Sequence, residues 1–128
     1  MQVIKVHDKQ FQPYIDAATL QQRIKEMAEQ INKDLEGDRP LFIAILNGSF
    51  MFAADVFKHL TIEAEISFIK LASYKGTKST GNIVQAIGLD EDLFSRTVVI
   101  LEDIVDTGKT LSQFLPQLEH QQPKKLLV

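Results

Sequence analysis

The stretch Val98–Thr110, which reads VVILEDIVDTGKT, carries the clearest structural signal in this sequence of 128 residues. Its aliphatic first part predicts a buried strand at 97–101, because a strand covered on both faces is apolar throughout. Two carboxylates, Glu102 and Asp103, follow at once. The turn from Asp106 to Thr110 then opens a helix predicted over 110–118. This order of strand, polar loop and helix is typical of an α/β domain.

The sequence before this stretch also alternates helices with strands. An amphipathic helix is predicted between an N-cap at Asp16 and a stop at Gly37. Its apolar face consists of long side chains at helical spacing, namely Leu20, Ile24, Met27, Ile31 and Leu35. A second helix is predicted at 50–60. Strands are predicted at 2–6, within an N-terminal arm of residues 1–15, and at 41–46, 62–71 and 82–87, with a further one beginning at 124. We therefore expect an α/β fold with a mostly parallel central sheet flanked by helices.

The segment 73–81, which reads SYKGTKSTG, differs from its surroundings because it contains two glycines and no aliphatic residue. That composition predicts a mobile loop. The strands predicted on either side of it would pair as an antiparallel hairpin. We therefore expect a flexible lid at this point of the fold.

The bulk composition narrows the classes of function. A net charge of −3 without a basic cluster argues against nucleic acid or a membrane surface as a partner. The absence of cysteine excludes a disulfide framework and a thiolate metal site, and it fits a reducing cytoplasm. The N-terminal residues lack the apolar run of a signal peptide, and no stretch approaches the ~20 apolar residues that cross a bilayer. The length suits one domain over 1–128.

The loop after the 97–101 strand has the chemistry of a sugar-phosphate site. Main-chain N–H groups at a helix N-terminus bind phosphate, and Gly108 allows a close approach of the backbone. Thr107, Thr110 and Lys109 offer further donors. The carboxylates of Glu102 and Asp103 can accept hydrogen bonds from ribose hydroxyls or bind a hard cation such as Mg²⁺. A ribose-phosphate with a chelated cation satisfies all of these groups.

Two other interpretations of the same loop compete with this one. Gly108-Lys109-Thr110 resembles the end of a Walker A loop, but that motif requires glycine where this chain has Asp103. The loop could also be purely structural, with Asp106 or Thr107 capping the helix and the two carboxylates exposed to solvent.

The order of residues across the whole stretch adds a family resemblance. VVILEDIVDTGKT resembles the phosphoribosyl-pyrophosphate signature of type I phosphoribosyltransferases, and Asp106 followed by Thr-Gly-Lys-Thr is similar to the hypoxanthine-guanine branch. Residues 45–52 (ILNGSFMF) resemble the pyrophosphate loop of that family, which often contains a non-proline cis peptide. Many members have lysine at the position of Asn47. Ser73 and Tyr74 resemble the start of the catalytic lid.

The resemblance implies purine salvage. The reaction would be a Mg²⁺-dependent transfer of ribose-5-phosphate from phosphoribosyl pyrophosphate to hypoxanthine or guanine, giving IMP or GMP and pyrophosphate. It implies Asp106 as the catalytic acid or base, and Glu102 and Asp103 as ligands of the ribose hydroxyls and of the metal. The 5-phosphate would be bound by Asp106, Thr107, Gly108, Lys109 and Thr110, and pyrophosphate by Asn47 and Gly48. Ser73 and Tyr74 would close the site. A homo-oligomer, dimer or tetramer, is also implied.

The same resemblance implies that the family's C-terminal part is missing after Val128. That part holds a lysine that reads the purine oxygen, an aromatic residue that stacks on the base, and a further aspartate near a second Mg²⁺. We therefore expect a truncated domain that is potentially inactive. Two alternatives remain open: an enzyme of the same fold for xanthine or a pyrimidine base, and a non-catalytic RNA-binding regulator of pyrimidine genes.

Overall fold

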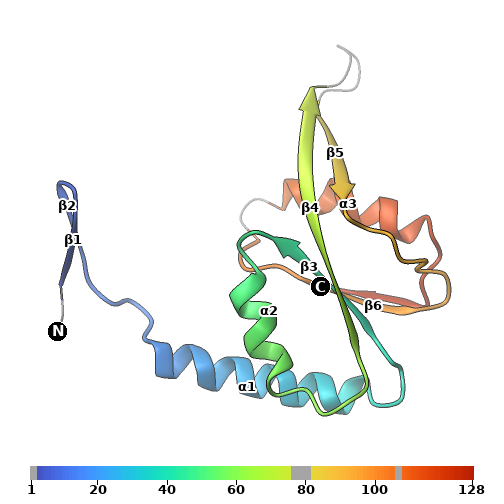
Figure 1. Cartoon of the computed structure of the whole chain (residues 1–128), viewed down its shortest axis with the longest axis horizontal. Coiled ribbons are helices and arrows are strands. Elements are labelled where there is room, and N and C mark those ends of the chain that lie inside the picture. The colour runs from blue at the N-terminus through green and yellow to red at the C-terminus, as the bar shows by residue number, and fades with distance from the viewer. Residues whose placement is uncertain (1–2, 76–81, 106–107) are drawn as a thin grey trace.

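The computed structural model describes residues 3–75, 82–105 and 108–128, and its core is a five-stranded sheet. The strand order is β5 (Asn82–Ile87), β4 (Glu65–Lys75), β3 (Leu41–Leu46), β6 (Thr97–Leu101) and β7 (Lys125–Leu127). β3 pairs in parallel with both β4 and β6, β6 pairs in parallel with β7, and only β5 runs antiparallel, beside β4 (Figure 1). The carboxyl ends of β3 and β6 therefore meet at one edge of the sheet. The predicted fold class is confirmed.

Three helices cover the two faces of this sheet (Figure 1). α1 (Ala17–Asp34) and α2 (Phe50–Phe57) lie on one face, and α3 (Lys109–Glu119) lies on the other. The predicted N-cap of α1 is confirmed, because the Asp16 carboxylate accepts a hydrogen bond of 2.8 Å from the Thr19 N–H. None of the helices in the described part of the chain is long and apolar enough to cross a membrane.

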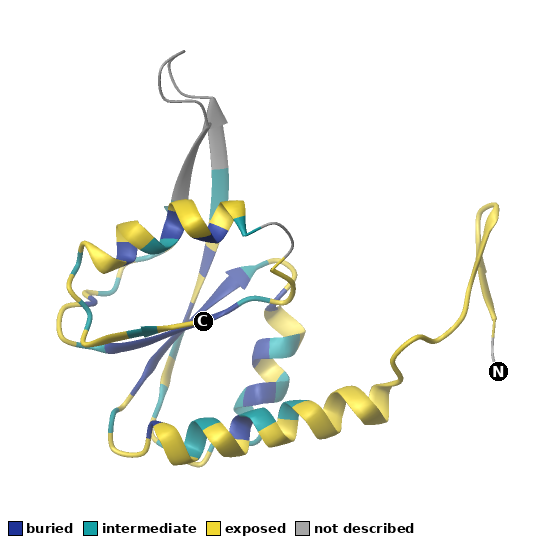
Figure 2. Ribbon diagram, turned by 180° about the vertical axis from the view of Figure 1, so that it is seen from behind, coloured by how far each residue is buried: buried dark blue, intermediate teal, exposed yellow. Residues whose placement is uncertain are grey.

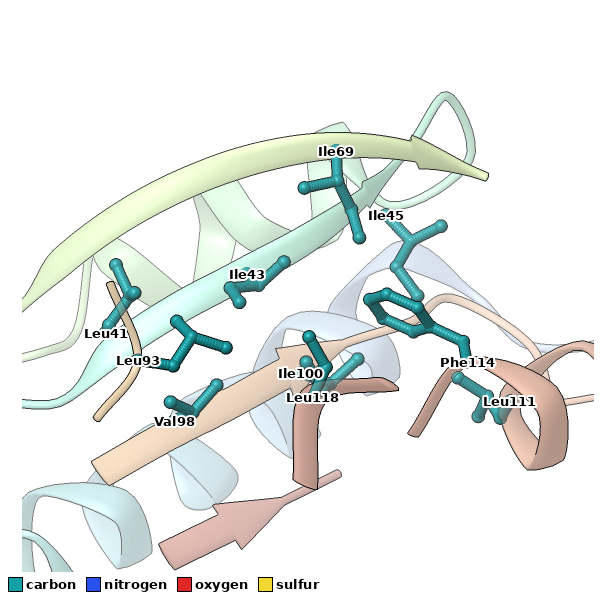
Figure 3. Close-up of a cluster of buried hydrophobic side chains, with 10 residues drawn as sticks. All are labelled: Leu41, Ile43, Ile45, Ile69, Leu93, Val98, Ile100, Leu111, Phe114 and Leu118. Atoms are coloured by element: carbon teal, nitrogen blue, oxygen red, sulfur yellow. The ribbon is translucent and has the colours of Figure 1, made fainter. Parts of the chain in front are cut away.

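The continuous apolar run of β3 is explained by two cores, one on each face of the sheet. Leu41, Ile43 and Ile45 point toward α3, where Phe114 fills the centre of the layer (Figure 3). Phe42 and Ala44 point to the other face and pack with Leu35 and Ala53. Because side chains alternate along a strand, every residue of such a run is buried when both faces are covered, as Figure 2 shows for the central strands.

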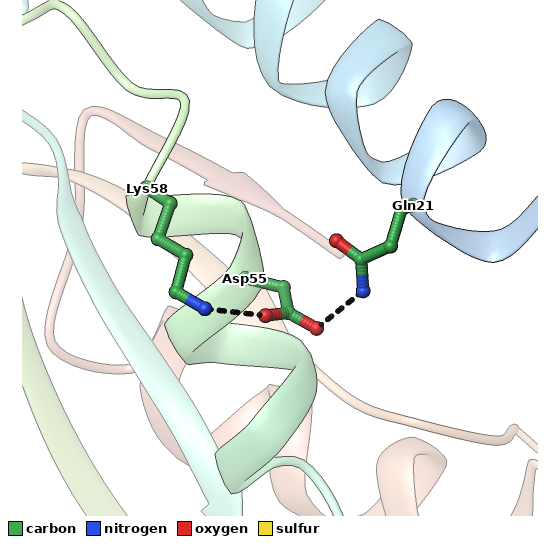
Figure 4. A network of polar contacts seen from close by, with 3 residues as sticks. All are labelled: Gln21, Asp55 and Lys58. Atoms are coloured by element: carbon green, nitrogen blue, oxygen red, sulfur yellow. Dashed lines mark hydrogen bonds and ion pairs between the residues drawn. The ribbon is translucent and has the colours of Figure 1, made fainter. Parts of the chain in front are cut away.

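Polar contacts join α1 to α2 and to the loop that follows it. The Gln21 amide donates to one oxygen of Asp55 at 3.0 Å, and the Lys58 ammonium donates to the other at 3.2 Å (Figure 4). These contacts are exposed, so each contributes little to stability. The half-buried Asn32 donates to the carbonyl of His59 at 3.0 Å and accepts from the Thr61 N–H at 2.9 Å, which fixes the entry to β4.

The N-terminal arm forms a separate hairpin that stands apart from the sheet (Figure 1). The strand expected at 2–6 is found as β1 (Ile4–Val6), and it pairs in antiparallel fashion with β2 (Lys9–Phe11). Every residue of both strands is exposed. The sequence does not predict β2, because its three residues have no buried face and therefore no apolar alternation to reveal them.

Two predicted boundaries are wrong in ways that affect the site. The helix predicted at 50–60 ends at Phe57, and the strand predicted at 62–71 spans Glu65–Lys75. Ser73 and Tyr74 therefore lie in β4 rather than in a loop. Their main chain pairs with Val84 and Ile83 of β5, and this ladder sustains a strand regardless of the polar composition. The rest of the predicted mobile loop, 76–81, lies outside the described residues.

Candidate functional site

A cavity of about 460 Å³ opens at the carboxyl ends of β3 and β6. Ligands of open α/β sheets bind at this edge, beyond the ends of the strands. Two stretches that are distant in sequence meet there: the turn after β3, and the loop after β6 together with the beginning of α3 that follows it. The lining residues are Ile45, Leu46, Gly48, Leu71, Glu102, Asp103, Ile104, Val105, Gly108, Thr110 and Leu111.

The turn after β3 contains a cis peptide bond between Leu46 and Asn47, as the family resemblance implies for this loop. Ser49 fixes the turn from inside, because its buried hydroxyl donates to the carbonyl of Ile45 at 2.5 Å. The Ser49 N–H donates to the same carbonyl at 3.3 Å. Asn47 and Gly48 are exposed at the top of the turn. Within the described part of the chain, the Gly48 N–H has no hydrogen-bond partner and is left for a ligand.

The two adjacent carboxylates at the end of β6 differ in their electrostatics. Burial raises the pKa of Glu102 from 4.5 to about 7, with added contributions from a hydrogen bond to Asp103 and from its charge. Asp103 is exposed, and its pKa is lowered by the hydrogen bond from Glu102 and by one from the Ile104 N–H. The Asp103 N–H also donates to Glu102 at 3.1 Å. At pH values near the raised pKa of Glu102, the pair thus holds about half a proton on average, and its negative charge is correspondingly smaller.

This acidic pair fits a hard divalent cation. Carboxylate oxygens are the donors that Mg²⁺ prefers, and Mg²⁺ often keeps several waters while using only one or two protein carboxylates. A cation beside Glu102 would replace the proton that the pair now shares. No cluster of three or more acidic or histidine side chains occurs among the residues that the structure describes.

The beginning of α3 closes the third side of the cavity. Gly108 is the N-cap, with a φ of 81°, and no atom lies within 4 Å of a β-carbon built on it. Glycine therefore suits this position because of its left-handed backbone, not because of crowding. The N-cap residue itself has no side chain, and Lys109 and Thr110 are exposed in the first turn of the helix. Asp106 and Thr107, predicted as catalytic and phosphate-binding, lie outside the described residues.

Six apolar residues of the cavity are not among the site residues expected from the sequence: Ile45, Leu46, Leu71, Ile104, Val105 and Leu111. Ile104 is 73% exposed and Val105 is 54% exposed, although both are aliphatic. The sequence does contain a signal for this pair, because two aliphatic residues stand between acidic residues in a segment predicted as a polar loop. For Ser73 and Tyr74 the structure describes only the main chain, so their predicted contact with substrate stays a prediction.

Two further hollows do not combine these chemical groups. A cavity of about 600 Å³ lies between the end of α1 and the segment before β4, with Arg39 and Glu63 among its residues. It is at the amino ends of β3 and β4, opposite the edge where ligands bind in such sheets. An apolar groove of about 500 Å³ runs between α1 and the strands β6 and β7, and it includes Glu102 and Val105.

Comparisons with known proteins identify relatives of this chain. The chain is 38% identical over 109 residues to a hypoxanthine-guanine-xanthine phosphoribosyltransferase of Tritrichomonas foetus, a match that covers 85% of this chain and 60% of that protein. It is 41% identical over 109 residues to a hypoxanthine phosphoribosyltransferase of Buchnera aphidicola, covering 83% and 62%. The chain thus spans about 60% of the length of these curated relatives.

Solved structures give the same result. A hypoxanthine-guanine phosphoribosyltransferase from Bacillus anthracis, with a HEPES molecule in its active site, superposes with a TM-score of 0.81 at 35% identity, covering 91% of this chain and 69% of that one. A hypoxanthine phosphoribosyltransferase from Staphylococcus aureus has a TM-score of 0.80 at 30% identity, covering 91% and 65%. The family model described as the phosphoribosyl transferase domain matches residues 15–127. The chain therefore belongs to the phosphoribosyl transferase domain family.

Proposed function

We propose that this chain forms the donor-binding part of a purine-salvage phosphoribosyltransferase that uses phosphoribosyl pyrophosphate. The observation that supports this most is the cavity of about 460 Å³, where a free main-chain N–H, an acidic pair and a helix N-terminus meet. Each of these groups matches one part of the donor: pyrophosphate, the ribose hydroxyls with a Mg²⁺ ion, and the 5-phosphate. The base would be a 6-oxopurine, as the names of the relatives suggest.

In this proposal each segment has a separate role. Gly48 and Asn47 bind pyrophosphate, and Glu102 and Asp103 orient the ribose hydroxyls. The bound Mg²⁺ would supply positive charge that stabilises the departing pyrophosphate. Main-chain N–H groups at the start of α3, with the hydroxyls of Thr107 and Thr110, hold the 5-phosphate. The purine nitrogen then attacks the anomeric carbon as the bond to pyrophosphate breaks.

The base needs an apolar surface and a group that exchanges a proton with it. The exposed aliphatic side chains of Ile104 and Val105 line the cavity beside Glu102, and they offer such a surface for one face of a purine. Asp106 follows directly in the sequence, and we assign it the proton exchange at the ring nitrogen. Ser73 and Tyr74 would cover the site from β4 and keep out water, which would otherwise hydrolyse the donor.

Calorimetry tests the donor site directly. We expect phosphoribosyl pyrophosphate to bind, and to bind more tightly with Mg²⁺ than without it. Hypoxanthine, guanine, xanthine and uracil are then added separately to the loaded chain. Heat or product with hypoxanthine or guanine supports the proposal, whereas a response to xanthine alone or to uracil alone would reassign the base. Xanthine has a specific basis, since the name of the Tritrichomonas foetus relative includes it. No donor binding under either condition would overturn the proposed function.

The catalytic assignment of Asp106 has its own test. Asp106→Asn keeps the size of the side chain but removes the exchangeable proton. In a preparation that turns over, we expect kcat to fall about 10²–10⁴-fold, the usual contribution of a general acid or base, while donor affinity changes far less. Equal losses in kcat and in donor affinity would assign Asp106 to binding instead.

Self-association and location are further parts of the proposal. Phe50 and Met51 in the first turn of α2 are 57% and 65% exposed, and this adjacent apolar pair offers a contact surface to a second copy. Sedimentation velocity of the unsubstituted chain and of a Met51→Lys variant would test this. A monomer in both would contradict it. A cytoplasmic location, and the absence of nucleic-acid and membrane partners, stay predictions from composition.

A further inference from the structure

The backbone conformation at Gly48 does not by itself require a glycine. Gly37, Gly88 and Gly108 have φ angles of 82°, 97° and 81°, which favour glycine, but the φ of Gly48 is outside that left-handed region. Its surroundings are different as well. A β-carbon built on Gly48 would lie 2.9 Å from Cγ and 3.1 Å from Oδ1 of Asp103, and closer still to Oδ2. The Asp103 carboxylate thus occupies the space that a side chain at 48 would need.

We infer that Gly48 is a positioning residue for Asp103. By having no side chain, it lets the Asp103 carboxylate lie directly against the 47–49 turn. Glu102 and the Ile104 N–H also act on that carboxylate, since both lower its pKa. The turn after β3 and the acidic pair after β6 therefore act as one unit, although more than fifty positions separate them in the sequence.

The role in ligand binding rests on the proposed function. In a donor with a bound cation, the Gly48 N–H would bind the pyrophosphate, and the Asp103 carboxylate would bind the ribose hydroxyls and the cation. The two protein groups therefore need a fixed separation. A methyl group at 48 changes that separation. Because Asp103 is exposed and its side chain has only two dihedral angles, the added methyl rotates the carboxylate away instead of unfolding the chain.

The test compares Gly48→Ala, Asp103→Ala and the double variant. We expect Gly48→Ala to weaken phosphoribosyl pyrophosphate with Mg²⁺ about 10- to 100-fold, the loss expected when a hydrogen bond to a charged group is broken. In the Asp103→Ala background the same change at 48 should have no further effect on affinity. Equal losses in both backgrounds would show that the methyl acts on the donor directly, and would overturn the inference.

A second measurement needs neither donor nor metal. The Ile104 N–H lowers the pKa of the Asp103 carboxyl group and so senses where that carboxylate lies, and its NMR shift in Gly48→Ala should move toward the value in Asp103→Ala. Gly37→Ala is the matched control, because nothing lies within 4 Å of the new methyl there, and it should leave this amide unmoved. An Ile104 amide that is unchanged in Gly48→Ala would overturn the inference. If the unsubstituted chain binds no donor, the proposed function fails while this measurement still decides the positioning role.

Discussion

The carboxyl group of Glu102 should make the free energy of unfolding depend on pH, and replacing Glu102 with glutamine should remove that dependence. Burial, the hydrogen bond to Asp103 and the Asp103 charge together raise its pKa from 4.5 to about 7 in the folded chain. Between these two values the folded state binds more protons than the unfolded state. The free energy of unfolding therefore decreases as the pH rises through this window, and the penalty is complete above pH 7.

The magnitude follows from the size of the shift. At about 1.4 kcal/mol per pKa unit, a rise from 4.5 to about 7 corresponds to about 3 kcal/mol at most. Solvent still reaches part of the side chain and screens the charge, so about 1–2 kcal/mol is the expected effect. Glu102→Gln keeps the shape and cannot ionise. We expect the unsubstituted chain to lose about 1–2 kcal/mol relative to this variant between pH 4.5 and pH 8.

Urea denaturation followed by circular dichroism at these two pH values measures the difference. Taking the difference between the two proteins removes the contributions of the three histidines, which both contain. Glu29→Gln, an exposed carboxylate on α1, is the matched control for the loss of a side-chain charge. Adding Mg²⁺ at pH 8 should stabilise the unsubstituted chain more than Glu102→Gln, because a cation favours the ionised pair. If the pH profiles of the chain and of Glu102→Gln are parallel, the electrostatic account of the acidic pair is wrong.

Three substitutions test the packing that holds the site in place, each by urea denaturation. Phe114→Ala, in the centre of the α3 core, should cost about 3–5 kcal/mol, because it removes a fully buried ring; a cost below about 1 kcal/mol would show that α3 is loosely attached. Asp16→Ala removes the cap on Thr19 and should cost about 1 kcal/mol, and Asp16→Ser should recover most of it. Asn32→Ala breaks the two hydrogen bonds to the loop before β4 and should cost about 1–3 kcal/mol, whereas no change would mean that water replaces both.

The sequence predicts those features that depend on local pattern. A run of six apolar residues, Leu41–Leu46, leaves little choice but a strand covered on both faces. Asp16 precedes an amphipathic helix and caps it. The acidic pair lines the cavity, and its position follows from the local pattern because ligands of a parallel sheet bind beyond the carboxyl ends of the strands.

The features that depend on contacts between distant residues are not visible in the sequence. Ser73 and Tyr74 look like loop residues, and only the pairing of their main chain with β5 makes them strand residues. The contact of Gly48 with Asp103 joins two segments whose separation no spacing rule fixes. The raised pKa of Glu102 follows from burial at the rim of the cavity, which depends on how the segments pack together.

The outer edge of β7 has a consequence for how this chain behaves in concentrated solution. β7 is the last strand of the sheet, only three residues long, and its Leu127 is 42% exposed. An apolar edge strand with unpaired main-chain groups is a template on which another strand can add. The charged side chain of Lys125 disfavours such pairing only at the beginning of the strand. Among the described residues, this short stretch of backbone on the far side of β6 from β3 is therefore a surface to which a further strand can pair.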